Sequence, residues 1–410
     1  MQRIGRRRVL AAGLAGMSLM LPAVRSTRAI AAAQPGGAPS CGAPTVTPSS
    51  ATLLHNPRVA AAIASLPGEI EVLRLKVGIP SVALGIVHDQ QVLFEAGFGC
   101  ANVAAGIPAT PRTVYRIGSI TKVFQATMLM QLRDTGRLEL SDPVERYVPE
   151  VFYRAPDGSR ASPTFLQLAS HTAGLPQAMP RGLSTVPQFL RYVEGITAEA
   201  APGTRYAYSN VGFVLLGQAC AMIAGEPYHA LVDHHIFAPL GMTSCTYDIS
   251  TVDRSRLAVG YTHLEQTTTG RQGRAAGYGN PFPPSGTILS TVEDMERFIM
   301  LQFRRGPAGG DQILAGGSIE EMWRPVAPTQ GRASIAIGWH TAPFGSQTLV
   351  SKNGGQAGFT SLLCMLPELK LGVIGFVNMS PEAGPGAGSW LAELERMILT
   401  RLAGALDHPR

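Results

Sequence analysis

The spacing of apolar residues predicts that both ends of the chain contribute to one antiparallel sheet. Apolar positions recur at helical spacing over residues 57–76, and two β-type runs follow at 81–88 and 91–98. The far end reads in the reverse order, with strand patterns before a terminal helix, at 335–341, 347–351, 359–366, 371–378 and 390–402. Antiparallel strands joined by short turns, with terminal helices covering a face, predict an α/β fold in which helices flank an antiparallel β-sheet.

The middle of the chain has the spacing of helices instead. This pattern recurs at 124–133, 165–170, 186–194, 212–223 and 229–237. We therefore expect a mainly helical domain, residues 126–279, inserted into an α/β sandwich domain made of residues 55–125 and 280–410. The sequence shows no internal repeat and no second run long enough to cross a membrane.

The first 33 residues have the composition of an export signal. Residues 1–33 carry six arginines and no acid, with a weakly hydrophobic run and a short alanine stretch. The string Gly5-Arg6-Arg7-Arg8-Val9-Leu10 resembles a twin-arginine signal, which would export the folded protein to the periplasm or out of the cell. An amphipathic anchor is the alternative. The next segment, 34–54, is rich in small and turn-forming residues and is expected to be a flexible leader.

The formal charge of +6 belongs to this signal. Without its six arginines the chain has 28 basic and 28 acidic residues, so the mature protein is neutral. No basic stripe remains, which argues against nucleic acid as a partner. We expect a monomer without a stable membrane span.

Five cysteines without a C-x-x-C pair argue against a disulfide scaffold. Folding in a reducing cytosol before export would leave them mostly as buried thiols. One bridge among them, such as Cys220 with Cys245, stays open.

Lysine is rare, and two of its four copies stand where an amine could act chemically. These are Lys122 and Lys352, whereas Lys76 and Lys370 need no special role. In Ser119-Ile120-Thr121-Lys122 the hydroxyl and the amine are three positions apart, so on a helix they share a face. Apolar residues follow on more than one face, which predicts a buried helix and a lowered lysine pKa, as a general base requires. An N-cap serine beside a snorkelling lysine is the structural alternative.

A second cluster, Tyr208-Ser209-Asn210, is predicted to lie on a tight loop before the helix at 212–223. A phenol ionises near pH ~10, but one ammonium at about 4 Å and an effective dielectric near 20 favours the phenolate by roughly 4 kcal/mol. One lysine could therefore make Tyr208 a base. A Tyr and an Asn that only cap and pack the next helix are the alternative.

The third cluster, Lys352-Asn353-Gly354-Gly355, is expected at the end of a strand. Glycines allow a ligand to approach the backbone closely, and a free NH at the edge of a strand can donate to an oxyanion. An ordinary Asn-Gly hairpin turn would explain the same string.

In this order, Ser-x-x-Lys, Tyr-x-Asn and Lys-x-Gly resemble the motifs of the serine β-lactamase and penicillin-recognising DD-peptidase superfamily. The chain is most similar to class C β-lactamases and family VIII esterases. Residues 114–118, 168–175, 239–242 and 290–294 also look like stretches of that family. The likeness covers roughly residues 55–402, nearly all of the mature chain.

The resemblance implies an acyl-enzyme mechanism without metal or organic cofactor. Ser119 would be the acylated nucleophile, Lys122 its base and Tyr208 the proton carrier. Lys352 would stabilise the phenolate and the bound substrate. The backbone NH groups of Ser119 and Gly355 would form the oxyanion hole.

The resemblance also implies a substrate-binding set, which comprises Asn210, Asn353, Gly354 and Gly355. At Asn353 the chain departs from the Lys-Thr-Gly usual in β-lactamases, whose Thr hydroxyl helps to hold a substrate carboxylate, although an Asn amide can donate to the same group. We expect an exported serine hydrolase for β-lactams or D-Ala-D-Ala-type cell-wall peptides, that is, a small-molecule or peptidoglycan-derived substrate. A carboxylesterase for short acyl esters and a penicillin-binding or regulatory protein with little turnover are the alternatives.

Two histidine-containing stretches are not assigned to chemistry. His171 has no Gly-x-Ser-x-Gly elbow to serve, so we expect a structural hydrogen-bonding histidine. In Asp233-His234-His235 adjacent side chains diverge on a helix, and no His-Glu-x-x-His occurs, so no metal site is predicted.

Overall fold

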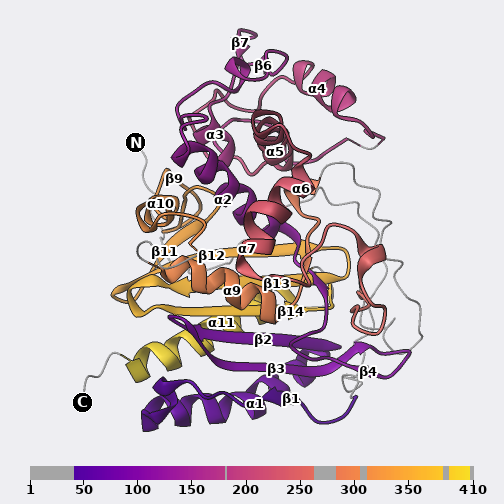
Figure 1. The fold of residues 1–410 in the computed structure, drawn as a ribbon, viewed down its shortest axis with the longest axis vertical. Helices are drawn as coiled ribbons and strands as arrows, with labels where there is room; N and C mark the ends of the chain where they lie inside the picture. The colour runs from indigo at the N-terminus through magenta and orange to yellow at the C-terminus, as the bar shows by residue number, and fades with distance from the viewer. Residues whose placement is uncertain (1–40, 181, 263–282, 305–311, 382–386, 407–410) are drawn as a thin grey trace, which may run out of the picture. The chain divides into compact units, whose positions relative to one another are not determined.

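The predicted antiparallel sheet is present and joins the two ends of the chain. The computed structural model describes residues 41–180, 182–262, 283–304, 312–381 and 387–406, and within them ten strands form one sheet of order β1-β3-β2-β14-β13-β12-β11-β10-β9, with β4 paired to β3 (Figure 1). The strands are β1 Thr45–Thr47, β2 Ser81–His88, β3 Gln91–Asn102, β4 Ile107–Pro108, β9 Ala327–Pro328, β10 Ser334–Ile335, β11 His340–Phe344, β12 Gln347–Gln356, β13 Phe359–Leu366 and β14 Leu371–Val377. The predicted fold class is confirmed.

The central strands are apolar along their whole length because both faces of the sheet are covered. β13 and β14 are buried at every position, and β2 at every position except His88. β2 pairs with β14 from Val82↔Val377 to His88↔Leu371, so the first strands depend on the last one.

Different helices cover the two faces of the sheet. Helices α1 Pro57–Val77 and α11 Ala387–Leu406 contact each other and pack on one face (Figure 1). Their core includes Val82 and Leu84 of β2, whereas the neighbouring Ala83 belongs to the core of the other face. Helix α9, Val292–Phe303, packs against β2 and β14.

The predicted helices of the middle region are also present. They are α2 Thr121–Asp134, α3 Phe165–Ala169, α4 Val186–Glu194, α5 Asn210–Ala224, α6 Tyr228–Val232, the π-helical turn Asp233–Phe237 and α7 Ala238–Leu240, with α10 Gly316–Met322 further along the chain. The helix predicted over 229–237 is therefore split between α6 and the π-helical turn. The strand predicted over 335–341 is interrupted, because Gly338 takes a φ of 78° and donates its N–H to Ala169 O.

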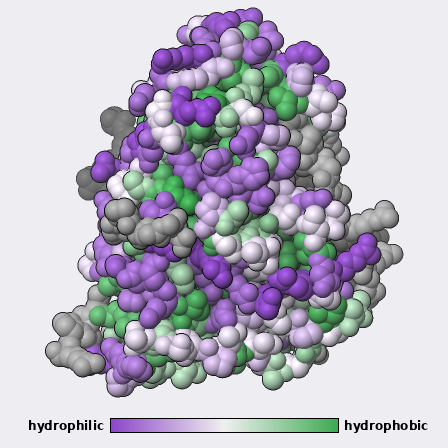
Figure 2. All heavy atoms as spheres, in the orientation of Figure 1, coloured by the Kyte–Doolittle hydropathy of each residue, from purple (hydrophilic) through white to green (hydrophobic). Residues whose placement is uncertain are grey.

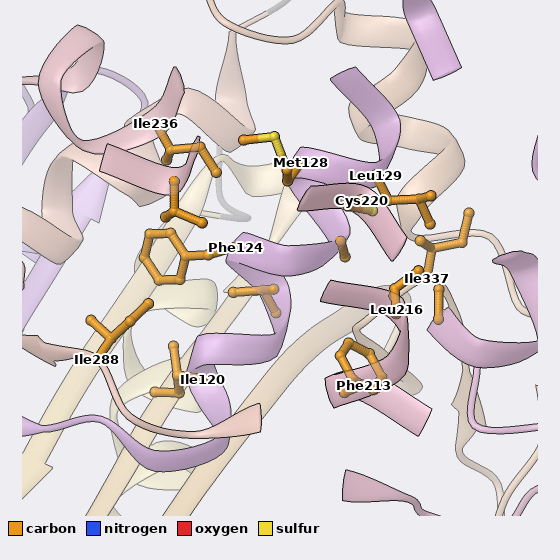
Figure 3. Close-up of a cluster of buried hydrophobic side chains, with 14 of the residues drawn as sticks. Ile120, Phe124, Met128, Leu129, Phe213, Leu216, Cys220, Ile236, Ile288 and Ile337 are labelled. Carbon is orange, nitrogen blue, oxygen red and sulfur yellow. The ribbon is translucent and has the colours of Figure 1, made fainter. Parts of the chain in front are cut away.

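Helix α2 is the buried centre of this region. Eleven of its residues, from Thr121 to Leu132, are buried, as the apolar residues on several faces predicted. Figure 3 shows how it packs against α5 and its surroundings through Ile120, Phe124, Met128, Leu129, Phe213, Leu216, Cys220, Ile236, Ile288 and Ile337. The polar side chains among these eleven residues, including that of Lys122, are therefore removed from water.

The cysteine pairing that the sequence left open is wrong. Cys220 and Cys245 are free and buried, while Cys41 and Cys100 form a disulfide across 59 residues. Burial raises the pKa of Cys220 to about 12, and Cys245 Sγ lies 3.1 Å from Ser290 Oγ. The disulfide joins the start of the described chain to β3, where β1 pairs as an edge strand.

The expected export signal, residues 1–33, lies outside the described residues. Within the part of the chain that is described, no single helix is long and apolar enough to span a membrane, and one bent pair, Asn210–Ala224 with Tyr228–Leu240, meets the length and composition criteria. On the face shown in Figure 2, hydrophilic and hydrophobic residues are interspersed.

Candidate active site

Ser119 lies in a 3₁₀ turn, Gly118–Ile120, that leads directly into α2. The turn follows the short strand β5 Tyr115–Arg116, which pairs with β8 Leu289–Ser290. No side chain caps the N-terminus of α2 at Thr121. The Ser119 hydroxyl is therefore not used as a helix cap, which was the structural alternative.

Two side chains reach the Ser119 hydroxyl, one from the next turn of the chain and one from a distant segment. Lys122 Nζ lies 3.1 Å from Ser119 Oγ, and Tyr208 Oη lies 2.7 Å from the same oxygen. The lysine is the predicted i,i+3 neighbour, and the tyrosine comes from the loop before α5. A hydroxyl in this position can lose its proton to an amine while a phenol proton stays available for a leaving group.

Lys122 is fully buried, and this burial lowers its pKa to about 7. Its other hydrogen-bond acceptors are Asn210 Oδ1, at 2.8 Å, and the backbone carbonyl of Ser285. A neutral amine has two N–H donors and one lone pair. The two acceptors can take both N–H groups, which leaves the lone pair for the proton of Ser119.

The loop that carries Tyr208 leads into a helix, as predicted, and the N-terminus of this helix is capped. Ser209 Oγ accepts a hydrogen bond from Gly212 N at 2.8 Å, and Asn210 begins α5. The capping role therefore belongs to Ser209. The side chains of Tyr208 and Asn210 instead reach Ser119 and Lys122.

Lys352 is the second buried lysine, and its ammonium has no hydrogen-bond partner among the described residues. Its Nζ lies 5.4 Å from the centre of the Tyr208 ring, and that of Lys122 lies 5.1 Å from the same centre. Burial lowers the pKa of Lys352 to about 8; Tyr208 opposes this shift, and Lys122 adds to it. An ammonium in this position favours a nearby anion, either the Tyr208 phenolate or a negatively charged group of a ligand.

The residues after Lys352 continue the strand and do not form the hairpin turn that an Asn-Gly pair allows. Asn353 pairs with Leu362 inside the β12–β13 ladder and its side chain is exposed, while the turn contains Gly358 at a φ of 83°. Only residues 347–351 of β12 are paired with β11 in the described sheet. From residue 352 onward, β12 thus has a partner strand on one side.

Glycines bring β12 against the turn that holds Ser119. A Cβ on Gly354 would lie 2.1 Å from Ile117 O, and a Cβ on Gly118 would lie 3.0 Å from Gly355 N and 3.1 Å from Gly355 O. Gly118 also has a φ of 51°. This approach requires glycine, and it places the Gly355 amide beside the Ser119 turn, where the sequence predicted an oxyanion donor.

The structure adds groups that the sequence did not indicate. The carbonyl of Ser285 belongs to a 3₁₀ turn, Pro283–Ser285, and a backbone acceptor has no residue-type signal. Tyr206 Oη lies 3.4 Å from His340 Nε2, and burial and then Lys352 lower the pKa of His340 to about 3. These two rings were not candidates, because neither belongs to a motif.

The Asp233-His234-His235 string lies on the π-helical turn, where His234 Nδ1 faces Glu226 Oε2 at 3.2 Å. In the described ranges no group of three His, Cys, Asp or Glu side chains could hold a metal ion.

The comparison with known families agrees with this geometry. The family model described as Beta-lactamase matches residues 59–396. The chain belongs to the β-lactamase family. It is a serine hydrolase of this family, and the resemblance inferred from the three motifs is confirmed.

Individual relatives carry related descriptions. "D-alanyl-D-alanine-carboxypeptidase/endopeptidase AmpH" of Escherichia coli (strain K12) is 30% identical over 321 residues, which cover 74% of this chain and 80% of that protein. The octameric penicillin-binding protein homologue from Pyrococcus abyssi is 28% identical with a TM-score of 0.70, and the match covers 83% of this chain and 77% of the homologue's chain. A class C beta lactamase from Rhodobacter sphaeroides is 22% identical, also with a TM-score of 0.70, over 84% of this chain and 99% of its own, and supports the fold.

Proposed function

We propose that this β-lactamase-family protein hydrolyses D-Ala-D-Ala-type cell-wall peptides or β-lactams through an acyl-enzyme on Ser119. The observation that carries the proposal is the position of Ser119 Oγ, 3.1 Å from the buried amine of Lys122 and 2.7 Å from the Tyr208 hydroxyl. With a pKa of about 7, half of the Lys122 side chains are neutral at pH ~7, so the base form is available without a metal or a second base.

In the proposed acylation step, Lys122 takes the proton of Ser119 as Oγ attacks the substrate carbonyl carbon. The C–O bond forms, and the carbonyl oxygen becomes an oxyanion that accepts from the backbone NH groups of Ser119 and Gly355. When the tetrahedral intermediate collapses, the C–N bond breaks and Tyr208 gives its proton to the leaving nitrogen. In deacylation Tyr208 accepts a proton from water as the hydroxide attacks the ester carbonyl. The C–O bond to Ser119 then breaks, and Lys122 returns its proton to Ser119 Oγ, which restores the free enzyme.

The proposed substrate carries a carboxylate near the scissile bond. Lys352 supports this, because its buried ammonium has no hydrogen-bond partner in the described residues and would gain from a bound anion. The exposed amide of Asn353, on the next residue of β12, can donate to the same group. The name of the Escherichia coli relative points to the same substrate class.

We also propose that residues 1–33 act as a twin-arginine signal and that the protein is exported by that route. The Cys41–Cys100 disulfide supports an oxidising destination, since such bonds persist outside the reducing cytosol.

Intact-mass kinetics tests the function. The purified protein is mixed with a β-lactam, a D-Ala-D-Ala peptide or a short-chain aryl ester, alongside Ser119→Ala and the control Ser346→Ala, an exposed serine in the β11–β12 turn. We expect turnover of the peptide or the β-lactam, with a transient adduct that only Ser119→Ala abolishes.

Three outcomes would contradict the proposal. Turnover of the ester alone would make the protein an esterase. A persistent β-lactam adduct without turnover would make it a penicillin-binding protein. Full activity of Ser119→Ala would exclude the acyl-enzyme on this residue.

A further inference from the structure

Tyr208 must be held in place by something other than regular secondary structure. Residues 206–209 belong to no helix or strand, yet Tyr208 Oη lies at hydrogen-bond distance from Ser119. A group that moves a proton loses its efficiency when it is displaced by about 1 Å. The contacts of this segment therefore decide whether Tyr208 can act.

Both residues that flank Tyr208 are hydrogen-bonded to the same partner, His171. Ala207 N donates to the His171 carbonyl at 2.7 Å, and Ser209 N donates to His171 Nδ1 at 3.0 Å. One bond lies on each side of Tyr208 in the sequence. The backbone on both sides of the tyrosine is thus fixed to one residue.

The position of His171 in the sequence is unusual for its residue type. Helix α3 ends in a turn in which His171 N donates to Leu168 O and Thr172 N donates to Gln167 O, the pattern of a Schellman motif. His171 has a φ of 55° at the left-handed position of this motif, where glycine is the common residue. A histidine there costs backbone strain, which indicates that its side chain has a task.

The ring of His171 also packs directly on the tyrosine. It is buried, and its centre lies 4.4 Å from that of Tyr208 and 4.7 Å from that of Phe213. Burial and then the charges of Lys352 and Lys122 hold the pKa of His171 well below its usual range, so the ring stays neutral. Because Nδ1 accepts from Ser209, the ring proton is on Nε2.

The rest of this loop is hydrogen-bonded to the residues that follow His171 in the sequence. Ser209 Oγ donates to Pro176 O at 2.7 Å, and Asn210 N donates to Gln177 O at 3.3 Å. The segment 171–177 therefore binds the backbone of residues 207–210 up to the start of α5.

We infer that His171 is a positioning residue, which fixes the Tyr208 hydroxyl at Ser119 through its Nδ1 acceptor, its carbonyl and its ring. The inference rests on the proposed role of Tyr208 in proton transfer. It gives His171 a task in the reaction, beyond the structural hydrogen bond that the sequence suggested.

Two substitutions distinguish the effect of losing the Nδ1 acceptor from the effect of disturbing the left-handed turn. His171→Gly and His171→Asn both fit a left-handed position and both remove the ring, but only Asn places an oxygen where Nδ1 stood. In steady-state kinetics with a chromogenic β-lactam and a D-Ala-D-Ala peptide, we expect His171→Gly to lower kcat about 100-fold with little change in KM. His171→Asn should stay within about tenfold of the unmodified protein, the loss expected for the ring contact.

The same substitutions in a Tyr208→Phe background show whether His171 acts through the tyrosine. We expect His171→Gly to cost less than about threefold there, because coupled residues are not additive. Thermal unfolding of each variant confirms that it is folded.

Several results would overturn the inference. If His171→Asn and His171→Gly lowered kcat equally, the Nδ1 acceptor would have no role and His171 would only fill space. If kcat of His171→Gly were unchanged, His171 would have no role in positioning Tyr208. A full loss in the Tyr208→Phe background would show that His171 does not act through Tyr208, while the proposed function stands. If Tyr208→Phe alone were as active as the unmodified protein, the proposed role of Tyr208 would fail and the inference with it.

Discussion

Replacing Lys122 by methionine should stabilise the fold most strongly at low pH, although it removes the proposed base. Burial lowers the pKa of Lys122 from its ordinary value to about 7. Below pH ~7 the side chain is charged in both the folded and the unfolded state, so the native protein carries the full cost of a buried ammonium. Between pH ~7 and ~10.4 the unfolded chain binds more protons, and the free energy of unfolding therefore rises with pH.

The magnitude follows from the two pKa values. A shift of about three and a half units corresponds to roughly 5 kcal/mol, of which about 3 kcal/mol is relieved between pH ~6 and ~9.5. Methionine has a similar length and no charge. The hydrogen bonds lost at Asn210 and Ser285 do not depend on pH, so they cancel when the same pair of proteins is compared at two pH values.

The assay is equilibrium urea unfolding, followed by the fluorescence of the three tryptophans. The advantage of Lys122→Met in free energy of unfolding should shrink by about 3 kcal/mol from pH ~6 to ~9.5. Lys76→Met, at an exposed lysine on α1, should show no such change. An advantage that stays constant or grows with pH would refute the buried ammonium.

Three further measurements address the site and the sheet. The proposed mechanism needs Lys122 neutral and Lys352 charged, so kcat/KM should rise with pH near pH 7 and fall near pH 8. Lys352→Met should lose the fall at alkaline pH, and a flat pH profile of the unmodified protein would contradict both roles. Gly118→Ala should lower activity by at least about tenfold because its Cβ would press on the backbone of β12, whereas Gly106→Ala, with a similar positive φ and open space around it, should not; equal activities would refute the close approach. Cys41→Ser should lower the free energy of unfolding by about 2–4 kcal/mol and should make it independent of dithiothreitol. If the free energy of unfolding of the unmodified protein were also independent of dithiothreitol, this would contradict the disulfide bond.

The elements that the sequence predicted are those set by local spacing. Helix α4 has the predicted bounds, 186–194, and α1 and β2 differ from their predicted ranges by at most one residue. Burial of Lys122 could be predicted as well, because apolar residues surround its helix on several faces. The order of the three motifs pointed to the family, and the family model that matches residues 59–396 confirmed it.

What could not be predicted depends on contacts between distant segments. Cys41 finds Cys100 only because β1 pairs with β3 at the edge of the sheet. Ser285 contributes a backbone carbonyl, and His171 acts from the end of α3 on residues 36 to 38 positions later, as Ala207 and Ser209 show. Neither contribution is visible in residue type or periodicity.

The pairing of β2 with β14 also dictates when the protein can first be complete during its synthesis. β2 emerges from the ribosome with an apolar edge that only Leu371–Val377 can cover. Until these last strands are made, the N-terminal hairpin lacks its neighbour, and Lys352 is absent from the site. Folding is therefore a late event dominated by long-range contacts, and such chains fold slowly and expose strand edges meanwhile.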